Sequence, residues 1–86
     1  MQIDLATLKQ RVIDVARAST LGKQVEDVVL ESDRDEGGAD FLRVVVYVRH
    51  DDQPKYDKLE ALLETIEDTV SAVDDRYPSV RFSDAA

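Results

Sequence analysis

The chain has 86 residues, no Cys, no Trp and a formal net charge of −8 at pH 7. This length allows a single domain over residues 1–86, and the missing Cys excludes a disulfide scaffold, a thiolate zinc site and a cysteine nucleophile. The sequence contains neither a long apolar run nor a basic-then-apolar leader, so it predicts no membrane span and no signal peptide and favours a cytoplasmic protein.

An amphipathic helix is predicted over about residues 4–20. Asp4 is placed to cap its first turn, because a carboxylate there can accept a hydrogen bond from an unpaired backbone amide. Gly22 lies just beyond the pattern, where a left-handed residue would end the helix. The apolar residues that recur at spacings of three and four are Leu5, Leu8, Val12, Val15 and Ala16.

Two strands follow, over residues 25–33 and 41–49, and the Asp- and Gly-rich turn 33–40 joins them. Such a tight connection predicts an antiparallel hairpin. In the first strand, Val28 and Leu30 point to one side and Val29 to the other. In the second strand, one face is formed by Leu42, Val44, Val46 and Val48, and the opposite face by Phe41, Arg43, Val45, Tyr47 and Arg49.

A second helix is predicted from the polar loop 50–54 to about residue 75. Pro54 suits the first helical position, with Asp52 or Gln53 as its cap. Pro78 ends the helical segment, and residues 79–83 form a short final strand. The apolar stripe of this helix is Tyr56, Leu59, Leu62, Leu63, Ile66, Val70 and Val73.

The element order predicts an α+β fold, namely a two-layer α-β-β-α-β sandwich. Each helix has one apolar face, so both helices are expected on one face of a three-stranded sheet. The crossover through the second helix predicts a last strand parallel to the second strand. The sequence leaves open whether the last strand lies beside the first strand or the second.

The uncovered sheet face is the first candidate site, and we expect it to be a protein–protein surface with a homodimer as one form. Clustered apolar groups on an open face mark interfaces, where Arg and Tyr are also favoured. By alternation this face carries Val29, Phe41, Arg43, Val45, Tyr47, Arg49 and Arg81, beside Asp27, Glu31 and Asp33.

Two other interpretations of the same face are open. One is a solvated face on which Glu31 and the arginines make cross-strand pairs. The other is a single-stranded RNA surface with Phe41 and Tyr47 as stacking platforms. The net charge of −8 repels phosphates and makes nucleic acid the less favoured partner.

The second candidate site is an acidic flank of the second helix, formed by Glu60, Glu64, Glu67 and Asp68. Such a stripe is either a solvated face or a docking ridge for a basic protein. Residues 1–23 carry four bases and two acids, whereas the rest of the chain carries seven bases and seventeen acids. Head-to-tail contact between two copies through their helices is therefore a further alternative.

The sequence contains no recognisable catalytic or cofactor motif, so we predict a protein that is not an enzyme and has no cofactor and no specific metal site. Asp33, Asp35 and Gly38 match a calcium loop, but Val44 stands where its bidentate Glu is required. Weak cation binding by the turn 33–40 is left open. His50 has no partner His or Cys for a metal and no Ser in a nucleophile context.

From Val25 onward the element order resembles the N-terminal domain of the ribosome maturation factor RimP. Leu42-Arg43-Val44-Val45-Val46 is similar to the second strand of that domain, and the acidic, Val-rich segment 25–31 is similar to its first strand. The family's last strand leads into a Ser-Ser-Pro-Gly signature, whereas this sequence has Ser83-Asp84 there. The resemblance implies the same topology and an RNA- or ribosome-associated role.

Taken together, these features predict a small acidic, non-catalytic protein-interaction module. An antitoxin-like or immunity-like protein, or another regulatory partner of a basic protein, fits this size and charge. The module would act through the open sheet face and the acidic helix flank, on a partner protein or a second copy. The alternative is an RNA- or ribosome-associated protein similar to the RimP domain.

Overall fold

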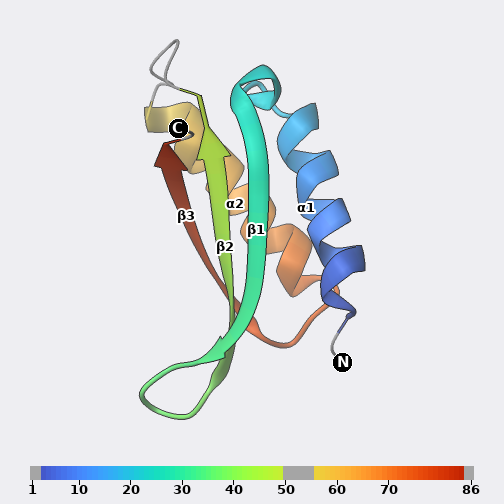
Figure 1. The fold of residues 1–86 in the computed structure, drawn as a ribbon, viewed down its shortest axis with the longest axis vertical. Helices are drawn as coiled ribbons and strands as arrows, with labels where there is room; N and C mark the ends of the chain where they lie inside the picture. The colour runs from blue at the N-terminus through green and yellow to red at the C-terminus, as the bar shows by residue number, and fades with distance from the viewer. Residues whose placement is uncertain (1–2, 50–55, 85–86) are drawn as a thin grey trace.

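The structure, a computed structural model, describes residues 3–49 and 56–84. The sheet forms one layer and both helices form the other (Figure 1), which confirms the predicted α+β sandwich. Neither helix in the described ranges is long and apolar enough to cross a membrane. The elements in chain order are α1 (Leu5–Ala18), the short 3-10 turn η1 (Gly22–Gln24), β1 (Val25–Arg34), β2 (Asp40–Val48), α2 (Tyr56–Ser71) and β3 (Tyr77–Asp84).

The sheet has the strand order β1-β2-β3, which answers the question that the sequence left open. β1 pairs antiparallel with β2, and β3 pairs parallel with the other edge of β2. The register shifts between Val25 and Asp27, so Glu26 is an extra residue in β1. This bulge lies at the start of the strand, so the alternation of inward and outward side chains from Asp27 onward is regular.

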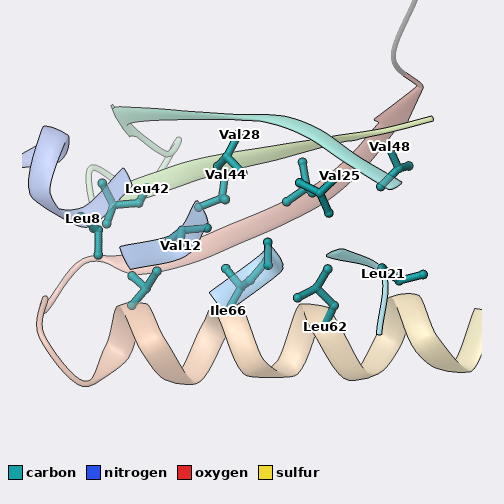
Figure 2. Packing of buried hydrophobic residues seen from close by; sticks show 13 residues of the cluster. Leu8, Val12, Leu21, Val25, Val28, Leu42, Val44, Val48, Leu62 and Ile66 are labelled. Carbon is teal, nitrogen blue, oxygen red and sulfur yellow. The ribbon is translucent and has the colours of Figure 1, made fainter. Parts of the chain in front are cut away.

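The core lies between the sheet and the two helices, as Figure 2 shows. Burying each Val, Leu or Ile side chain there stabilises the fold by about 1.5–3 kcal/mol. Most residues of the predicted helical stripes and the inward face of β2 reach this core. Tyr56, which was predicted in the stripe of the second helix, is wrong there: it is 79% exposed. Its fully buried members include Leu8, Val12 and Ala16 from α1, Val28 from β1, Leu42, Val44 and Val46 from β2, and Ile66 and Val70 from α2.

The two ends of α1 give one confirmed and one wrong prediction. Asp4 caps the helix, and its Oδ2 accepts a hydrogen bond from the Thr7 amide at 3.1 Å. The helix ends at Ala18, and its C-cap is Ser19 rather than a left-handed Gly22; the Ser19 hydroxyl donates to the Ala16 carbonyl at 2.6 Å. Gly22 has a negative φ and is needed for space, since a Cβ there would collide with the Arg17 carbonyl.

The second helix ends at Ser71, four residues earlier than predicted, and the turn that follows contains a buried ion pair. Arg76 donates from Nε to Asp74 Oδ1 at 2.9 Å and from Nη2 to Asp74 Oδ2 at 2.8 Å. Asp74 also accepts from the Ile3 amide at 2.9 Å, and Arg76 donates to the Ser32 hydroxyl at 3.2 Å. The Arg76 guanidinium holds the pKa of Asp74 far below its usual range.

This ion pair is fully satisfied, because no buried side-chain polar atom in the described ranges lacks a hydrogen-bond partner. It joins the start of the chain, β1 and the entry to β3, and so fixes this end of the sheet against the helices. The predicted cap at Asp52 or Gln53, Pro54 at the first helical position, and His50 all lie outside the described residues.

Candidate protein-interaction surface

The outer face of the sheet, on the side away from the helices, carries most of the residues that the sequence predicts there. Five of them alternate outward and are half-buried, namely Val29, Phe41, Arg43, Val45 and Tyr47. Arg81 on β3 is exposed and pairs in register with Val45. The strand register divides these residues into two groups with different contacts.

The first group, which we call the apolar half, consists of Val29, Val45 and Tyr47. Val29 on β1 lies directly opposite Val45 on β2, and Tyr47 lies opposite Asp27. Side chains directly opposite each other on one sheet face are about 4.5–5.5 Å apart at Cβ, so these groups form a continuous patch. Among the described residues, the Arg81 guanidinium beside this patch has no ion-pair partner.

The second group, which we call the hairpin half, is Glu31, Asp33, Phe41, Arg43 and Tyr77 at the other end of the strands. Arg43 donates to Asp33 Oδ2 at 2.9 Å and to Glu31 Oε2 at 3.3 Å. Its guanidinium carbon lies 5.4 Å from the centroid of the Phe41 ring. Phe41 stacks on Tyr77 with ring centroids 5.3 Å apart and an interplanar angle of 15°.

Asp35 connects the hairpin turn to this stack. Its Oδ2 accepts from the Tyr77 hydroxyl at 2.9 Å, and its Oδ1 accepts from the Ala39 amide at 2.9 Å. The hydrogen bond from the Ala39 amide, and then the one from Tyr77, hold the pKa of Asp35 below its ordinary value. The same hydrogen bond to Asp35 raises the pKa of the Tyr77 hydroxyl. Gly38 completes the turn with a φ of 86°.

Several carboxylates of the acidic turn are therefore already bound to other groups of the same chain. The Arg34 amide and then Arg43 lower the pKa of Asp33, and Asp40 pairs with Arg34 at 3.1 Å. In the part of the chain that the structure describes, no group of three or more His, Cys, Asp or Glu side chains could hold a metal ion.

Arg49 is set apart from the other predicted face residues, because β2 ends one residue before it. Its Nε pairs with Glu26 Oε1 at 2.9 Å, and its guanidinium donates to the Lys23 carbonyl. The Arg49 amide donates to the Gln24 carbonyl at 2.8 Å. Arg49 thus attaches η1 and the bulge at Glu26 to the end of β2.

The acidic flank of α2 lies on the opposite side of the molecule from the outer sheet face. The buried side chains of α2, Leu62, Ile66 and Val70, point toward the sheet. The flank residues are Glu60, Glu64 and Asp68, which are exposed, and Glu67, which is half-buried. Within the described ranges these carboxylates make no ion pair. The two predicted sites are therefore separate surfaces.

Sequence reasoning missed Tyr77 and Asp35 as members of the outer face. Tyr77 is 46% exposed and is the first residue of β3. Counting back from Arg81 in steps of two places Tyr77 on the outer face, and this signal was available once β3 was extended past Pro78. Pro78 is compatible with the strand because β3 is an edge strand.

No protein-family model matches the chain, and no curated protein matches it. Several solved structures are similar in fold. CzrB, described as a candidate zinc transporter, has a TM-score of 0.67 at 16% identity, with 94% of this chain and 92% of that chain covered. A MamM-CTD variant with one His replaced by Ala has a TM-score of 0.57 at 14% identity, with 96% of this chain and 100% of that chain covered.

A copper form of MamM-CTD with one Asp replaced by His also has a TM-score of 0.57, at 11% identity, covering 96% of this chain and 100% of that chain. These neighbours are C-terminal domains of cation diffusion facilitators, which have a ferredoxin-like fold. At such low identities the likeness is one of fold.

Proposed function

We propose that this chain is a non-catalytic protein-interaction module whose apolar half binds a partner protein. One observation carries the proposal: Val29, Val45 and Tyr47 stay half-buried and adjacent on a sheet face that neither helix covers. Apolar groups gathered in this way lose water contact when a second surface covers them, at about 25 cal/mol per Å².

The residue types in and beside the apolar half support the same location. Arg81 and Tyr47 belong to the residue types that dominate binding energy at interfaces. Arg81 has no ion-pair partner among the described residues, whereas Arg43 is already bound to Asp33 and Glu31. A partner therefore gains more by covering the apolar half than by covering the hairpin half.

The acidic flank of α2 is a second candidate surface, and it suits a basic partner. Glu60, Glu64 and Asp68 are exposed and lie away from the sheet, so a basic protein could bind there without covering the apolar half. An antitoxin-like, immunity-like or other regulatory role on a basic protein is proposed through this flank. The role implied by the RimP resemblance stays a prediction.

The names of the structural neighbours mention zinc and copper, but a metal is not part of this proposal. CzrB is described as a candidate zinc transporter, and one MamM-CTD structure is a copper form. Clusters of three or more ligating side chains are missing from residues 3–49 and 56–84. Binding should be measured with and without added zinc, so that an effect of the metal is separated from binding by the apolar half.

The test compares Tyr47→Asp with Tyr56→Asp as a matched control. Tyr47 lies in the apolar half, whereas Tyr56 is 79% exposed on α2. An added carboxylate in the apolar half would be desolvated by a partner, so Tyr47→Asp should weaken binding at least tenfold. The new carboxylate lies opposite Asp27, so some loss of stability is expected, and circular dichroism checks that the variant is folded. The readouts are light-scattering mass over a range of concentrations and capture of protein from the source cells.

Tyr56→Asp should bind like the wild type. Equal masses and equal capture for Tyr47→Asp and the wild type would overturn the proposal. The same measurements on Glu64→Arg tell the two surfaces apart, because loss of binding in that variant alone would move the interface to the flank of α2.

A further inference from the structure

We infer that the partner on the apolar half is a second copy of this chain, packed face to face with β1 of one copy over β3 of the other. This inference rests on the proposed function and names its partner. Two observations carry it, namely the distribution of charge over the three strands and the symmetry that two identical copies must obey.

Charge on the outer face is distributed unevenly. On β1 the outward residues from Asp27 onward include three acids, Asp27, Glu31 and Asp33. On β3 the residues that share this face are Tyr77, Ser79, Arg81 and Ser83, of which Arg81 carries the charge. The apolar residues Val45 and Tyr47 lie between these two edges on β2. Arg43 on β2 already pairs with Glu31 and Asp33. The charges of this face that have no ion-pair partner among the described residues are therefore Asp27 on β1 and Arg81 on β3, on either side of Val45 and Tyr47.

Two identical copies in a closed dimer are related by a twofold axis, which lies in the plane of the interface when two sheets face each other. An axis across the strands would place β1 over β1 and β3 over β3, so Asp27 of each copy would lie over the acidic strand and away from Arg81 of the other copy. An axis along β2 places β1 of each copy over β3 of the other. This second arrangement brings opposite charges together.

The strand register gives the contacts of the second arrangement. Val29 and Arg81 both pair with Val45, from opposite sides of β2. The axis along β2 therefore places Arg81 of each copy over Val29 of the other, one outward position from Asp27. Val45 and Tyr47 near the axis meet their own counterparts. Stacked sheets keep their strands within about 30° of each other, so the twist of the sheets preserves this pairing.

The dimer would complete contacts that one chain leaves open. Arg81, which has no ion-pair partner among the described residues, gains the Asp27 carboxylate of the second copy. Such charge pairs at the rim set the orientation of two surfaces more than their affinity, which comes from the apolar centre. Like charges placed opposite each other across an interface are strongly unfavourable, so reversing either charge should weaken the dimer.

The experiment exchanges the two charges. In a homodimer of Arg81→Asp, each introduced carboxylate would lie near Asp27 of the other copy. In a homodimer of Asp27→Arg, each introduced guanidinium would lie near Arg81 of the other copy. Each single variant should therefore dissociate at least tenfold more readily than the wild type. An equimolar mixture of the two variants should regain association as a mixed dimer. One of its two contacts joins the remaining Arg81 to the remaining Asp27, and the other joins the two introduced side chains, which also carry opposite charges. Native mass spectrometry identifies the mixed species, and sedimentation measures its dissociation constant.

The controls separate folding from association. Asp27 accepts a hydrogen bond from the Val28 amide at 2.8 Å, so Asp27→Asn, which keeps an acceptor oxygen, is a milder second variant. Circular dichroism checks that each variant is folded. The double variant with both charges exchanged should associate like the wild type, and Glu64→Arg on the far side should have no effect.

Each contrary result has a distinct meaning. A dimer that is lost in Tyr47→Asp but unaffected by Arg81→Asp and Asp27→Arg would overturn this inference and leave the proposed function standing. A wild type that is monomeric at every concentration would also overturn the inference, and a different partner lost in Tyr47→Asp would still support the proposed function. A dimer that only Glu64→Arg disrupts would overturn both.

Discussion

The apolar half and the hairpin half of the outer face are built on the same strands from similar residue types, yet their side chains make different contacts. In the hairpin half, Arg43 binds two carboxylates and lies over Phe41. In the apolar half, Val29 and Val45 lie opposite each other on this face, and Arg81 has no ion-pair partner among the described residues.

This difference separates residues that complete the fold from residues that can bind a partner. Both halves follow the same outward alternation, so the pattern alone assigns Phe41 and Arg43 to the interface together with Val45 and Tyr47. The structure shows that Phe41 and Arg43 already have partners within the chain. Substitutions in the hairpin half should therefore change stability, and substitutions in the apolar half should change association.

The largest expected effect comes from Asp74→Ala, which removes the ion pair that fixes one end of the sheet and so should destabilise the whole fold. This change leaves the Arg76 guanidinium buried without its carboxylate, and losing one partner of a buried pair costs about 3–5 kcal/mol. That is a large part of the roughly 5–15 kcal/mol that stabilises a small domain. Urea unfolding measures the loss, and association should fail with it.

The matched control for Asp74→Ala is Asp40→Ala, which breaks the exposed pair with Arg34. Exposed pairs contribute about 0–1 kcal/mol, so this variant should stay close to the wild type. If Asp74→Ala lost no more stability than Asp40→Ala, the buried ion pair would not be what fixes this end of the sheet.

A middle-sized effect is expected from Phe41→Ala, and it sharpens the comparison. The change removes the stack with Tyr77 and the ring beneath Arg43, so unfolding free energy should fall by about 1–2 kcal/mol while the dissociation constant of any complex is unchanged. Val45→Thr in the apolar half should raise the dissociation constant of a complex and change the free energy of unfolding little. A Phe41→Ala variant with normal stability and weakened association would reverse the assignment of the two halves.

The smallest expected effect is a pH dependence confined to the hairpin half. The folded pKa of Asp35 lies below its ordinary value, so its contribution is present above about pH 4 and is lost as the pH falls further. The folded pKa of Tyr77 lies above its ordinary value near 10, so its contribution is present below about pH 10 and is lost as the pH rises through the raised value.

Tyr77→Phe is the matched variant for this prediction, because it keeps the stack on Phe41 and removes the hydroxyl. Melting temperatures of the wild type should exceed those of Tyr77→Phe near neutral pH and converge with them at high pH. A difference that persists unchanged above the ionisation of Tyr77, followed by tyrosinate absorbance, would contradict this role for the hydroxyl.

The element order, the Asp4 cap and the outward alternation of β2 were predictable because each depends on neighbouring residues along the chain. The position of β3 beside β2 was not predictable, since both edges of the hairpin satisfy the same helix crossover. The end of α1 was misassigned because Gly22 fits two explanations, positive φ and close approach, and only packing against Arg17 separates them.

The buried pair of Asp74 and Arg76 was hidden for a similar reason. Two charged residues after a helix normally indicate a solvated turn, and the groups that make burial acceptable here, the Ile3 amide and the Ser32 hydroxyl, are distant in sequence. For the candidate site, alternation correctly placed the face residues, but it could not show that Arg49 turns toward Glu26 or that Arg43 is already paired.

The contact between Ile3 and Asp74 has a consequence for the order of folding events. Asp74 and Arg76 are two residues apart and can pair early, while water still surrounds them, but the Ile3 amide is 71 residues from Asp74. Because closing a contact across so long a stretch of chain costs conformational entropy before the contact is made, we expect the pair to be buried late in folding. Hydrogen exchange should then report the docking of residue 3 as the first contact to open when the native protein fluctuates.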